Sequence, residues 1–164
     1  MKEIYNGLPS WAKGIVVVGG IAIVYFTSKS IIKKFTLASK MQEFKKEAEF
    51  AKDEIYKLAQ QGIRPTLTQS QLEGMCQQLV SAFDGCGTDE EAVKRVFQRV
   101  RNDADVLSLI ATFGARKYDD CNLTEGFGDT TASLSKALTN ELDGDDVQTY
   151  VNDVLQSRGI KYRF

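Results

Sequence analysis

One short loop offers the best candidate for covalent chemistry in this sequence. Cys86 stands between Gly85 and Gly87, and Thr88 and a run of three acidic residues follow Gly87. A cysteine near a helix N-terminus can act as a thiolate nucleophile, because the helix dipole lowers its pKa. The chain contains no histidine, which is the usual base that activates such a nucleophile. We therefore predict a protein that is not an enzyme.

The three cysteines, Cys76, Cys86 and Cys121, are widely spaced and none belongs to a CxxC pair. A zinc site is therefore not expected. The odd number favours free thiols in a reducing compartment. A bridge between Cys86 and Cys121 is the alternative, because disulfide geometry cannot be determined from spacing alone.

The charge of the chain is asymmetric although its formal net value is only −1. Residues 1–64 hold eleven Lys/Arg against six acidic residues, whereas residues 65–164 hold ten against sixteen. A basic stem of charge +5 thus precedes an acidic domain of charge −6. Because phosphate contacts need clustered Lys and Arg, the acidic domain is not expected to bind nucleic acid.

An apolar run near the start of the chain predicts a membrane helix. Gly14–Phe26 contains no charge, but these thirteen residues rise only about 20 Å, short of a hydrocarbon core of about 30 Å. The longer segment Leu8–Ile32 has a suitable length, with Lys13 and Lys29 able to extend their ammonium groups to water. Trp11 suits one membrane interface. Residues 1–32 are therefore expected to form a transmembrane helix.

Two other interpretations of the apolar run stay open, a cleaved signal peptide and a buried core helix. No A-x-A cleavage site follows the run, and its flank is very basic. If the run spans a membrane, the positive-inside rule predicts that the N-terminus is outside and the C-terminal domain inside, because lysines crowd the C-terminal flank (Lys29, Lys33, Lys34, Lys40, Lys45 and Lys46).

Residues 33–64 are predicted to form an amphipathic stem helix. The apolar spacings alternate between four and three residues, which is a heptad seam (Leu37, Met41, Phe44, Ala48, Ala51, Ile55 and Leu58). Gly62 should end the helix, and Pro65 follows it. The seam can pack on the chain's own C-terminal domain, or it can mediate self-association of two stems.

Residues 65–164 are predicted to form a helical domain. Thr68 with Gln71 and Thr88 with Glu91 have the spacing of capping boxes that begin two helices. Asn102 is expected to cap a third helix, which Gly114 can end. Apolar residues recur on one face of each of these helices, which predicts a shared core.

The last third of the domain should begin with a loop over residues 115–130, which contain several Gly, Asn and Asp residues. A helix is expected over Thr131–Leu142. Asp145 with Gln148 should cap a final helix that Gly159 ends. The tail Ile160–Phe164 alternates apolar and polar residues and is expected to dock as a short extended segment.

Two segments of this domain resemble annexins. Ser81–Val93 (Ser-Ala-Phe-Asp-Gly-Cys-Gly-Thr-Asp-Glu-Glu-Ala-Val) resembles the start of an annexin repeat, whose hallmark is G-x-G-T-D between two helices. Leu134–Gly144 is similar to the fourth helix of such a repeat. The resemblance covers roughly Gln69–Ser157 and implies a compact annexin-repeat-like helical domain. Together with the apolar run and the heptad seam, the predicted fold is all-α, with an N-terminal transmembrane helix, an amphipathic stem helix and this helical domain. Annexins carry several repeats whereas this chain has one, and the stretch Cys121–Thr130 is longer than the family's pattern.

The resemblance also implies a Ca²⁺ site. In annexins the G-x-G loop binds Ca²⁺ through backbone carbonyls, and a distant carboxylate completes the site. Position by position, these ligands would be the carbonyls of Phe83, Gly85 and Gly87 and the carboxylate of Glu141. Ca²⁺ takes six to eight oxygen ligands, and glycine turns can aim carbonyls at an ion. Alternatively, the glycines serve only to end one helix and turn the chain into the next.

The whole layout is similar to small bacteriophage-encoded membrane and virion structural proteins. The function expected from this resemblance is that of a membrane-anchored, non-enzymatic structural or interaction protein. Its expected partners are membrane lipid and a protein such as a capsid or assembly protein. Its expected location is a single-pass membrane protein, or a membrane associated with a virion. The alternative is a Ca²⁺-dependent phospholipid-binding module.

Overall fold

The computed structural model describes residues 41–120 and 128–164. Contacts between Cα atoms divide the chain into residues 1–41 and 42–164, and the second unit is described below. That unit is mostly helical with one small sheet, in agreement with the predicted helical class. Within the described ranges, no helix is both long and apolar enough to cross a bilayer. The apolar run 8–32 lies outside them, so the membrane helix stays a prediction.

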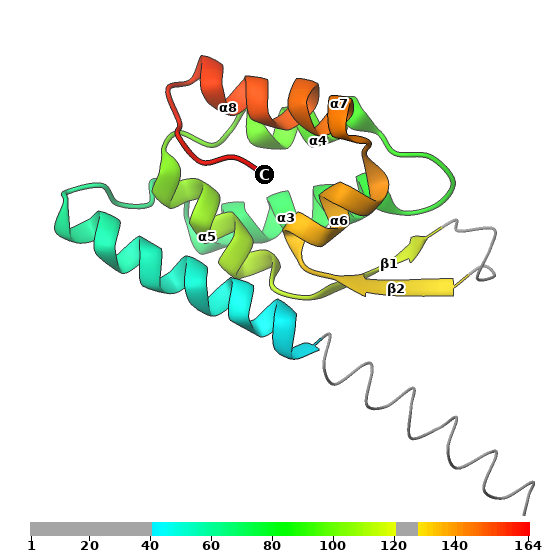
Figure 1. Cartoon of the computed structure of the whole chain (residues 1–164), viewed down its shortest axis with the longest axis horizontal. Helices are drawn as coiled ribbons and strands as arrows, with labels where there is room; N and C mark the ends of the chain where they lie inside the picture. The colour runs from blue at the N-terminus through cyan, green and yellow to red at the C-terminus, as the bar shows by residue number, and fades with distance from the viewer. Residues whose placement is uncertain (1–40, 121–127) are drawn as a thin grey trace, which may run out of the picture. The chain divides into compact units, whose positions relative to one another are not determined.

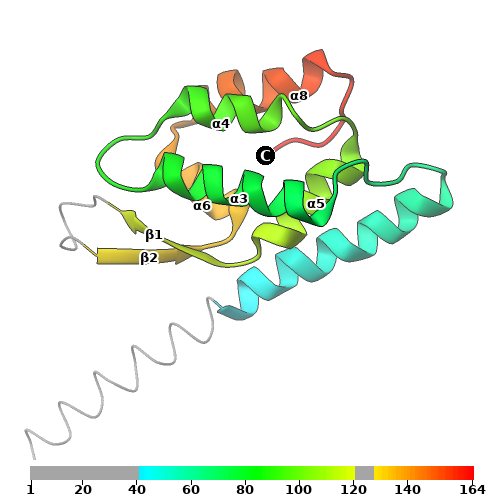
Figure 2. The same cartoon turned by 180° about the vertical axis from the view of Figure 1, so that it is seen from behind.

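The stem is helical over residues 41–60 and packs on the chain's own domain. Phe44 and Ala51 are buried, and Ile55 and Leu58 pack against the core. Figures 1 and 2 show this helix alongside α5 (Asp103–Phe113). The packing of the seam on its own domain is therefore confirmed for these residues, and the surface proposed for self-association is covered along this part of the stem.

One polar contact fixes the register of the stem helix. The carboxylate of Glu47 accepts hydrogen bonds from the backbone N–H and the hydroxyl of Ser135, at 3.3 and 2.6 Å. Ser135 lies in the first turn of α6 (Leu134–Glu141), where a negative charge also interacts favourably with the helix dipole. Gly62 ends the stem with a φ of 84°, as predicted.

Helices α3 (Gln69–Phe83) and α4 (Glu90–Phe97) form an antiparallel pair. The Thr68–Gln71 capping box at the start of α3 is confirmed. The Thr88–Glu91 box is wrong: Asp89 is the N-cap, and its side chain accepts the N–H of Ala92 at 2.8 Å. The Thr88 hydroxyl is instead used in a contact with α6, and a carboxylate at the neighbouring position can cap the helix equally well.

Helix α5 is the most buried helix of the described domain, since every residue from Ala104 to Ile110 is buried. Asn102 caps it and Gly114 ends it, as predicted. Asp105 is fully buried in the first turn and accepts hydrogen bonds from residues 66 and 67 and from Arg101. This carboxylate therefore joins the end of the stem, the α4–α5 connection and the core helix.

The segment predicted as a loop contains a β-hairpin, so this part of the all-α prediction is wrong. Strands β1 (Arg116–Asp120) and β2 (Gly128–Ala132) pair antiparallel, with Tyr118 opposite Thr130. The Tyr118 ring is buried and lies 5.8 Å from that of Phe83, measured between centroids. Tyr118 and the two threonines of β2 favour strand, and the buried ring fixes which face of the hairpin meets the core.

The chain ends in a series of short helices. Helix α6 begins at Leu134 rather than Thr131, because residues up to Ala132 pair in β2. Asp143, and not Asp145, caps the following helix α7 (Gly144–Asp146). This helix continues through a π-helical stretch, η1 (Val147–Asn152), into α8 (Asp153–Ser157).

The tail after Gly159 docks on the domain, as predicted. Ile160 is buried, and Asp103 accepts the backbone N–H groups of Lys161 and Tyr162 at 2.9 and 2.7 Å. The amide of Asn152 pairs with the backbone N–H and C=O of Phe164, at 3.0 and 3.2 Å. These contacts tie the tail to α5 and η1.

Candidate functional site

The loop between α3 and α4 has the conformation that its glycines allow. Gly85 and Gly87 have φ values of 101° and 93°, which side chains with a Cβ rarely adopt. The loop lies beside β1: the Gly85 N–H donates to the carbonyl of Asp119 at 3.0 Å, and the Asp119 N–H donates to the Asp84 carboxylate at 2.8 Å. The hairpin thus holds the glycine loop in place.

The structure also brings Glu141 to this loop. The hydroxyl of Thr88 donates to the backbone carbonyl of Glu141 at 2.9 Å, across 53 positions of sequence. Because Glu141 is the last residue of α6, this bond joins the end of that helix to the turn after Gly87. Two parts of the predicted calcium site, the glycine loop and the residue with the carboxylate, are therefore neighbours.

The cysteines differ from the prediction of three free thiols. Cys86 is disulfide-bonded. Cys76, on α3, is free and buried, and burial raises the pKa of its thiol to about 11. An oxidised Cys86 has no thiolate to act as a nucleophile. Cys86 in this state therefore does not supply the nucleophile considered from the sequence.

The chemistry of this loop can be compared with what Ca²⁺ requires. The three carbonyls of Phe83, Gly85 and Gly87 with the carboxylate of Glu141 give fewer than the six to eight oxygens that Ca²⁺ takes. Water or lipid phosphate oxygens would have to supply the rest. The Oε1 atom of Glu141 is buried. Within the described ranges, no three Asp, Glu, His or Cys side chains gather as a metal-binding group. The donor set therefore fits a weak site at most.

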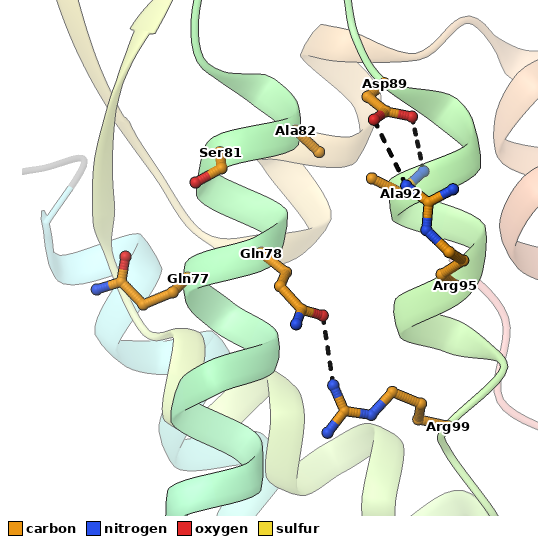
Figure 3. A pocket seen from close by; sticks show the side chains of 8 residues that line it. All are labelled: Gln77, Gln78, Ser81, Ala82, Asp89, Ala92, Arg95 and Arg99. Carbon is orange, nitrogen blue, oxygen red and sulfur yellow. Dashed lines mark hydrogen bonds and ion pairs between the residues drawn. The ribbon is translucent and has the colours of Figure 1, made fainter.

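A second feature is an open groove of about 680 Å³ between α3 and α4. Figure 3 shows its polar side chains: Gln77, Gln78 and Ser81 come from α3, and Arg95 and Arg99 come from α4 and the turn after it. The guanidinium of Arg99 donates to Gln78 Oε1 at 3.3 Å. Arg95 lies 3.6 Å from the Asp89 carboxylate, and both side chains are mostly exposed.

Exposed ion pairs of this length contribute about 1 kcal/mol or less. Neither guanidinium is therefore firmly held, and both can turn to an incoming acceptor. Arginine presents several donors in a planar fork that matches a carboxylate. The groove can thus accept an acidic side chain.

Two groups of charged residues lie at different ends of the domain, among other charges that belong to neither group. Exposed cationic residues surround the α4–α5 connection, and we call them the basic end (Arg64, Arg99, Arg101, Arg158 and Lys161). Carboxylates surround the starts of α4 and α7, and we call them the acidic end (Glu90, Asp143, Asp145 and Asp146). The net charge of the domain alone does not show where these two groups of charges lie.

Searches of known protein families, curated proteins and solved structures find no significant match to this chain. The likenesses to annexins and to phage membrane proteins therefore stay predictions.

Sequence reasoning missed the groove and the two charged ends. The four-residue spacing of Arg95 and Arg99 could have indicated a shared helix face. No sequence spacing indicates the basic end, because its members come from three segments that only the fold brings together.

Proposed function

We propose that this chain is a membrane-anchored, non-enzymatic structural or interaction protein. Its N-terminal apolar run would hold it in the bilayer, and residues 42–164 would present a folded surface to partner proteins. The observation that carries this proposal is that the stem helix forms part of the domain core, with Phe44 and Ala51 buried. The domain thus starts within about fifteen residues of the apolar run, and an extended chain of that length reaches at most about 50 Å.

The disulfide at Cys86 supports one of the two predicted locations over the other. Disulfides persist in oxidising surroundings such as virion surfaces and are rare in the cytosol. The lysines after the apolar run favour the cytosolic side for the domain during insertion. A membrane associated with a virion satisfies both observations, if the domain is inserted inside and oxidised after particle release.

Flotation with lipid vesicles tests the anchor. The full-length chain is expected to float with the vesicles and to resist alkaline carbonate extraction. The variant with Val18→Lys and Ile21→Lys should stay in the soluble fraction, because each central lysine costs about 3 kcal/mol of insertion free energy. Lys13→Arg is the matched control and should float like the unmodified chain. Flotation of the double-lysine variant would contradict a spanning helix.

One observation favours a second candidate function, Ca²⁺-dependent phospholipid binding. The hydroxyl of Thr88 donates to the backbone carbonyl of Glu141 at 2.9 Å, so this residue lies near the loop of Gly85 and Gly87, which supports the candidate. Phe83, Gly85, Gly87 and Glu141 would then hold the ion, and Ca²⁺ would bridge the loop to a lipid phosphate.

Titration calorimetry with Ca²⁺ separates this candidate from the first. Binding heat that Glu141→Gln abolishes, together with Ca²⁺-dependent flotation of a chain lacking residues 1–32, would establish the calcium module. Glu91→Gln is the matched control, because Glu91 is exposed and belongs to no predicted ligand set. Absence of heat at millimolar Ca²⁺ from a folded chain would eliminate this candidate.

A further inference from the structure

We propose that the basic end of the domain binds the acidic end of a second copy of this chain, so that copies associate head to tail. The partner is thus a carboxylate-rich surface, and the chain itself carries one. This inference concerns a surface of the domain and does not depend on the membrane anchor.

The basic end is built from three separate segments, around residues 64, 99–101 and 158–161. Asn102 donates to the carbonyl of Arg64 at 3.0 Å, and the Arg158 guanidinium donates to the carbonyl of Val100 at 2.8 Å. The backbone of Lys161 is held by Asp103 at 2.9 Å. These contacts bring the residues around Arg99 and Arg101 together. The helix dipole of α4 explains a cation in its last turn but not cations from the other segments.

Three nearby carboxylates, Asp103, Asp105 and Asp153, offset only part of the five positive charges of this end. Asp105 is fully buried and already accepts four hydrogen bonds. Asp103 accepts the N–H groups of the tail. The side chains of Arg64, Arg99, Arg101, Arg158 and Lys161 are all exposed. Their charges are therefore available to a partner at a cost in desolvation that is small for each one.

The acidic end is also held together by local contacts: the Asp143 carboxylate accepts the backbone N–H of Asp146 at 2.9 Å, and the side chains of Asp143 and Asp145 are exposed. Partial burial raises the pKa of Asp146, and the neighbouring charges of Asp143, Glu90 and Asp145 raise it further. Like charges held this close repel one another, so the cluster gains free energy when cations approach. The basic end supplies such cations.

The two ends cannot satisfy each other within one molecule. The acidic residues stand at the start of α7 and the basic ones near the end of α8, which is about 20 Å away along a fourteen-residue helical path from Gly144 to Ser157. Figures 1 and 2 show these helix ends at opposite sides of the domain. The Debye length at physiological salt is about 8 Å. The two ends of one molecule are therefore too far apart to attract each other, whereas the basic end of one copy can contact the acidic end of another.

The groove between α3 and α4 extends the basic end toward a docking surface. Arg99 belongs to both, and Arg95 lies one helical turn before it. Gln77, Gln78 and Ser81 add neutral donors along α3 (Figure 3). A carboxylate from the acidic end of another copy can thus meet Arg99 and the amide groups of α3, and it competes for Arg95 with Asp89, which also lines the groove. When the two ends of one copy contact two different neighbours, the association can continue as a row or close as a ring.

Neutralising variants test this arrangement in the full-length chain, kept in solution by a non-ionic detergent. The basic-end variant carries Arg99→Gln and Arg101→Gln, and the acidic-end variant carries Asp145→Asn and Asp146→Asn. Fluorescence anisotropy of a labelled copy measures binding to unlabelled copies. Each variant alone should associate about tenfold more weakly than the unmodified chain, since two surface ion pairs contribute about that factor. A mixture of the two variants should bind with nearly unmodified affinity, because one intact interface remains between them.

The experiment has two controls and three contrary outcomes. Lys136→Gln, an exposed cation on α6 outside both ends, should leave the association unchanged. Raising the salt from about 50 to 500 mM should weaken the association of the unmodified chain. A chain that stays monomeric at low salt would overturn the proposal. So would an association that survives in both variants, or a basic end that binds single-stranded DNA or anionic vesicles while the copies ignore one another.

Discussion

The buried carboxylate of Asp105 should stabilise the domain more than any exposed carboxylate that the structure describes. Its Oδ1 atom accepts the N–H groups of Thr66 and Leu67 at 2.6 and 3.2 Å. Its Oδ2 atom accepts the Thr66 hydroxyl at 2.8 Å and the Arg101 N–H at 3.0 Å. Asp105→Asn keeps the size of the side chain but replaces one acceptor oxygen with an amide group that only donates.

The cost of this substitution follows from the contacts that it removes. Whichever way the amide turns, at least one backbone N–H faces another donor, and the remaining bonds lose their charge-assisted character. A hydrogen bond to a charged group contributes about 1.5–3 kcal/mol, and a buried unsatisfied donor adds its own desolvation cost. We therefore expect Asp105→Asn to lower the free energy of unfolding by about 3–5 kcal/mol, a large part of the total of about 5–15 kcal/mol that is usual for a domain.

Chemical denaturation followed by far-ultraviolet circular dichroism measures this change. Tryptophan fluorescence is unsuitable, because the one tryptophan is Trp11, outside the domain. Asp145→Asn is the matched control: Asp145 is exposed, and the substitution should change stability by less than about 0.5 kcal/mol. Hydrogen exchange should also accelerate at Thr66 and Leu67. The reasoning is refuted if Asp105→Asn unfolds within about 1 kcal/mol of the unmodified chain.

Three further predictions concern the cysteines and the stem. Because burial raises the pKa of the Cys76 thiol from 9.0 to about 11, iodoacetamide should not modify this thiol in native protein near pH 8, and rapid alkylation would contradict its burial. The free energy of unfolding should fall as the pH rises from about 9 to 11, because the thiol ionises more readily in the unfolded chain. Cys76→Ala should remove that part of the decline. Peptide mapping without reductant should find Cys86 joined to Cys121, and reduction should lower the free energy of unfolding by up to about 4 kcal/mol. A link to Cys76 or between two chains would contradict this pairing. Ala51→Glu should detach the stem helix from the domain and raise its hydrogen-exchange rate, because Ala51 is buried and a charged side chain there is costly to bury. Lys52→Glu, on the exposed side of the helix, should not. Equal protection in both variants would mean that the stem is not docked.

The helices of the domain were largely predictable, because their signals are local. The capping box of Thr68 and Gln71, the N-cap Asn102 and the stop at Gly114 all depend on residues a few positions apart. The apolar stripes of α3, α4 and α5 follow the helical period and coincide with the observed core. The choice between adjacent capping residues, such as Thr88 and Asp89, was not predictable, since the hydroxyl of Thr88 is needed by α6.

The hairpin was missed because its stability is not local. Its strands have few apolar residues, and Tyr118 becomes a strand residue through packing on Phe83, 35 positions earlier. The candidate calcium site was predicted through resemblance, and the structure places Glu141 beside the loop. The groove and the basic end depend on tertiary contacts, so no spacing in the sequence could have indicated all their members.

Trp11 allows the most direct test of the claim that the start of the chain lies in a bilayer. It is the one tryptophan of the sequence, so its emission reports on this segment alone. In vesicles of phospholipid brominated at defined acyl positions, we expect blue-shifted emission with the strongest quenching by bromines near the headgroups, where an interfacial tryptophan would lie. Emission near that of tryptophan in water, unquenched by bromine at any depth, would contradict the membrane anchor and the function proposed on it.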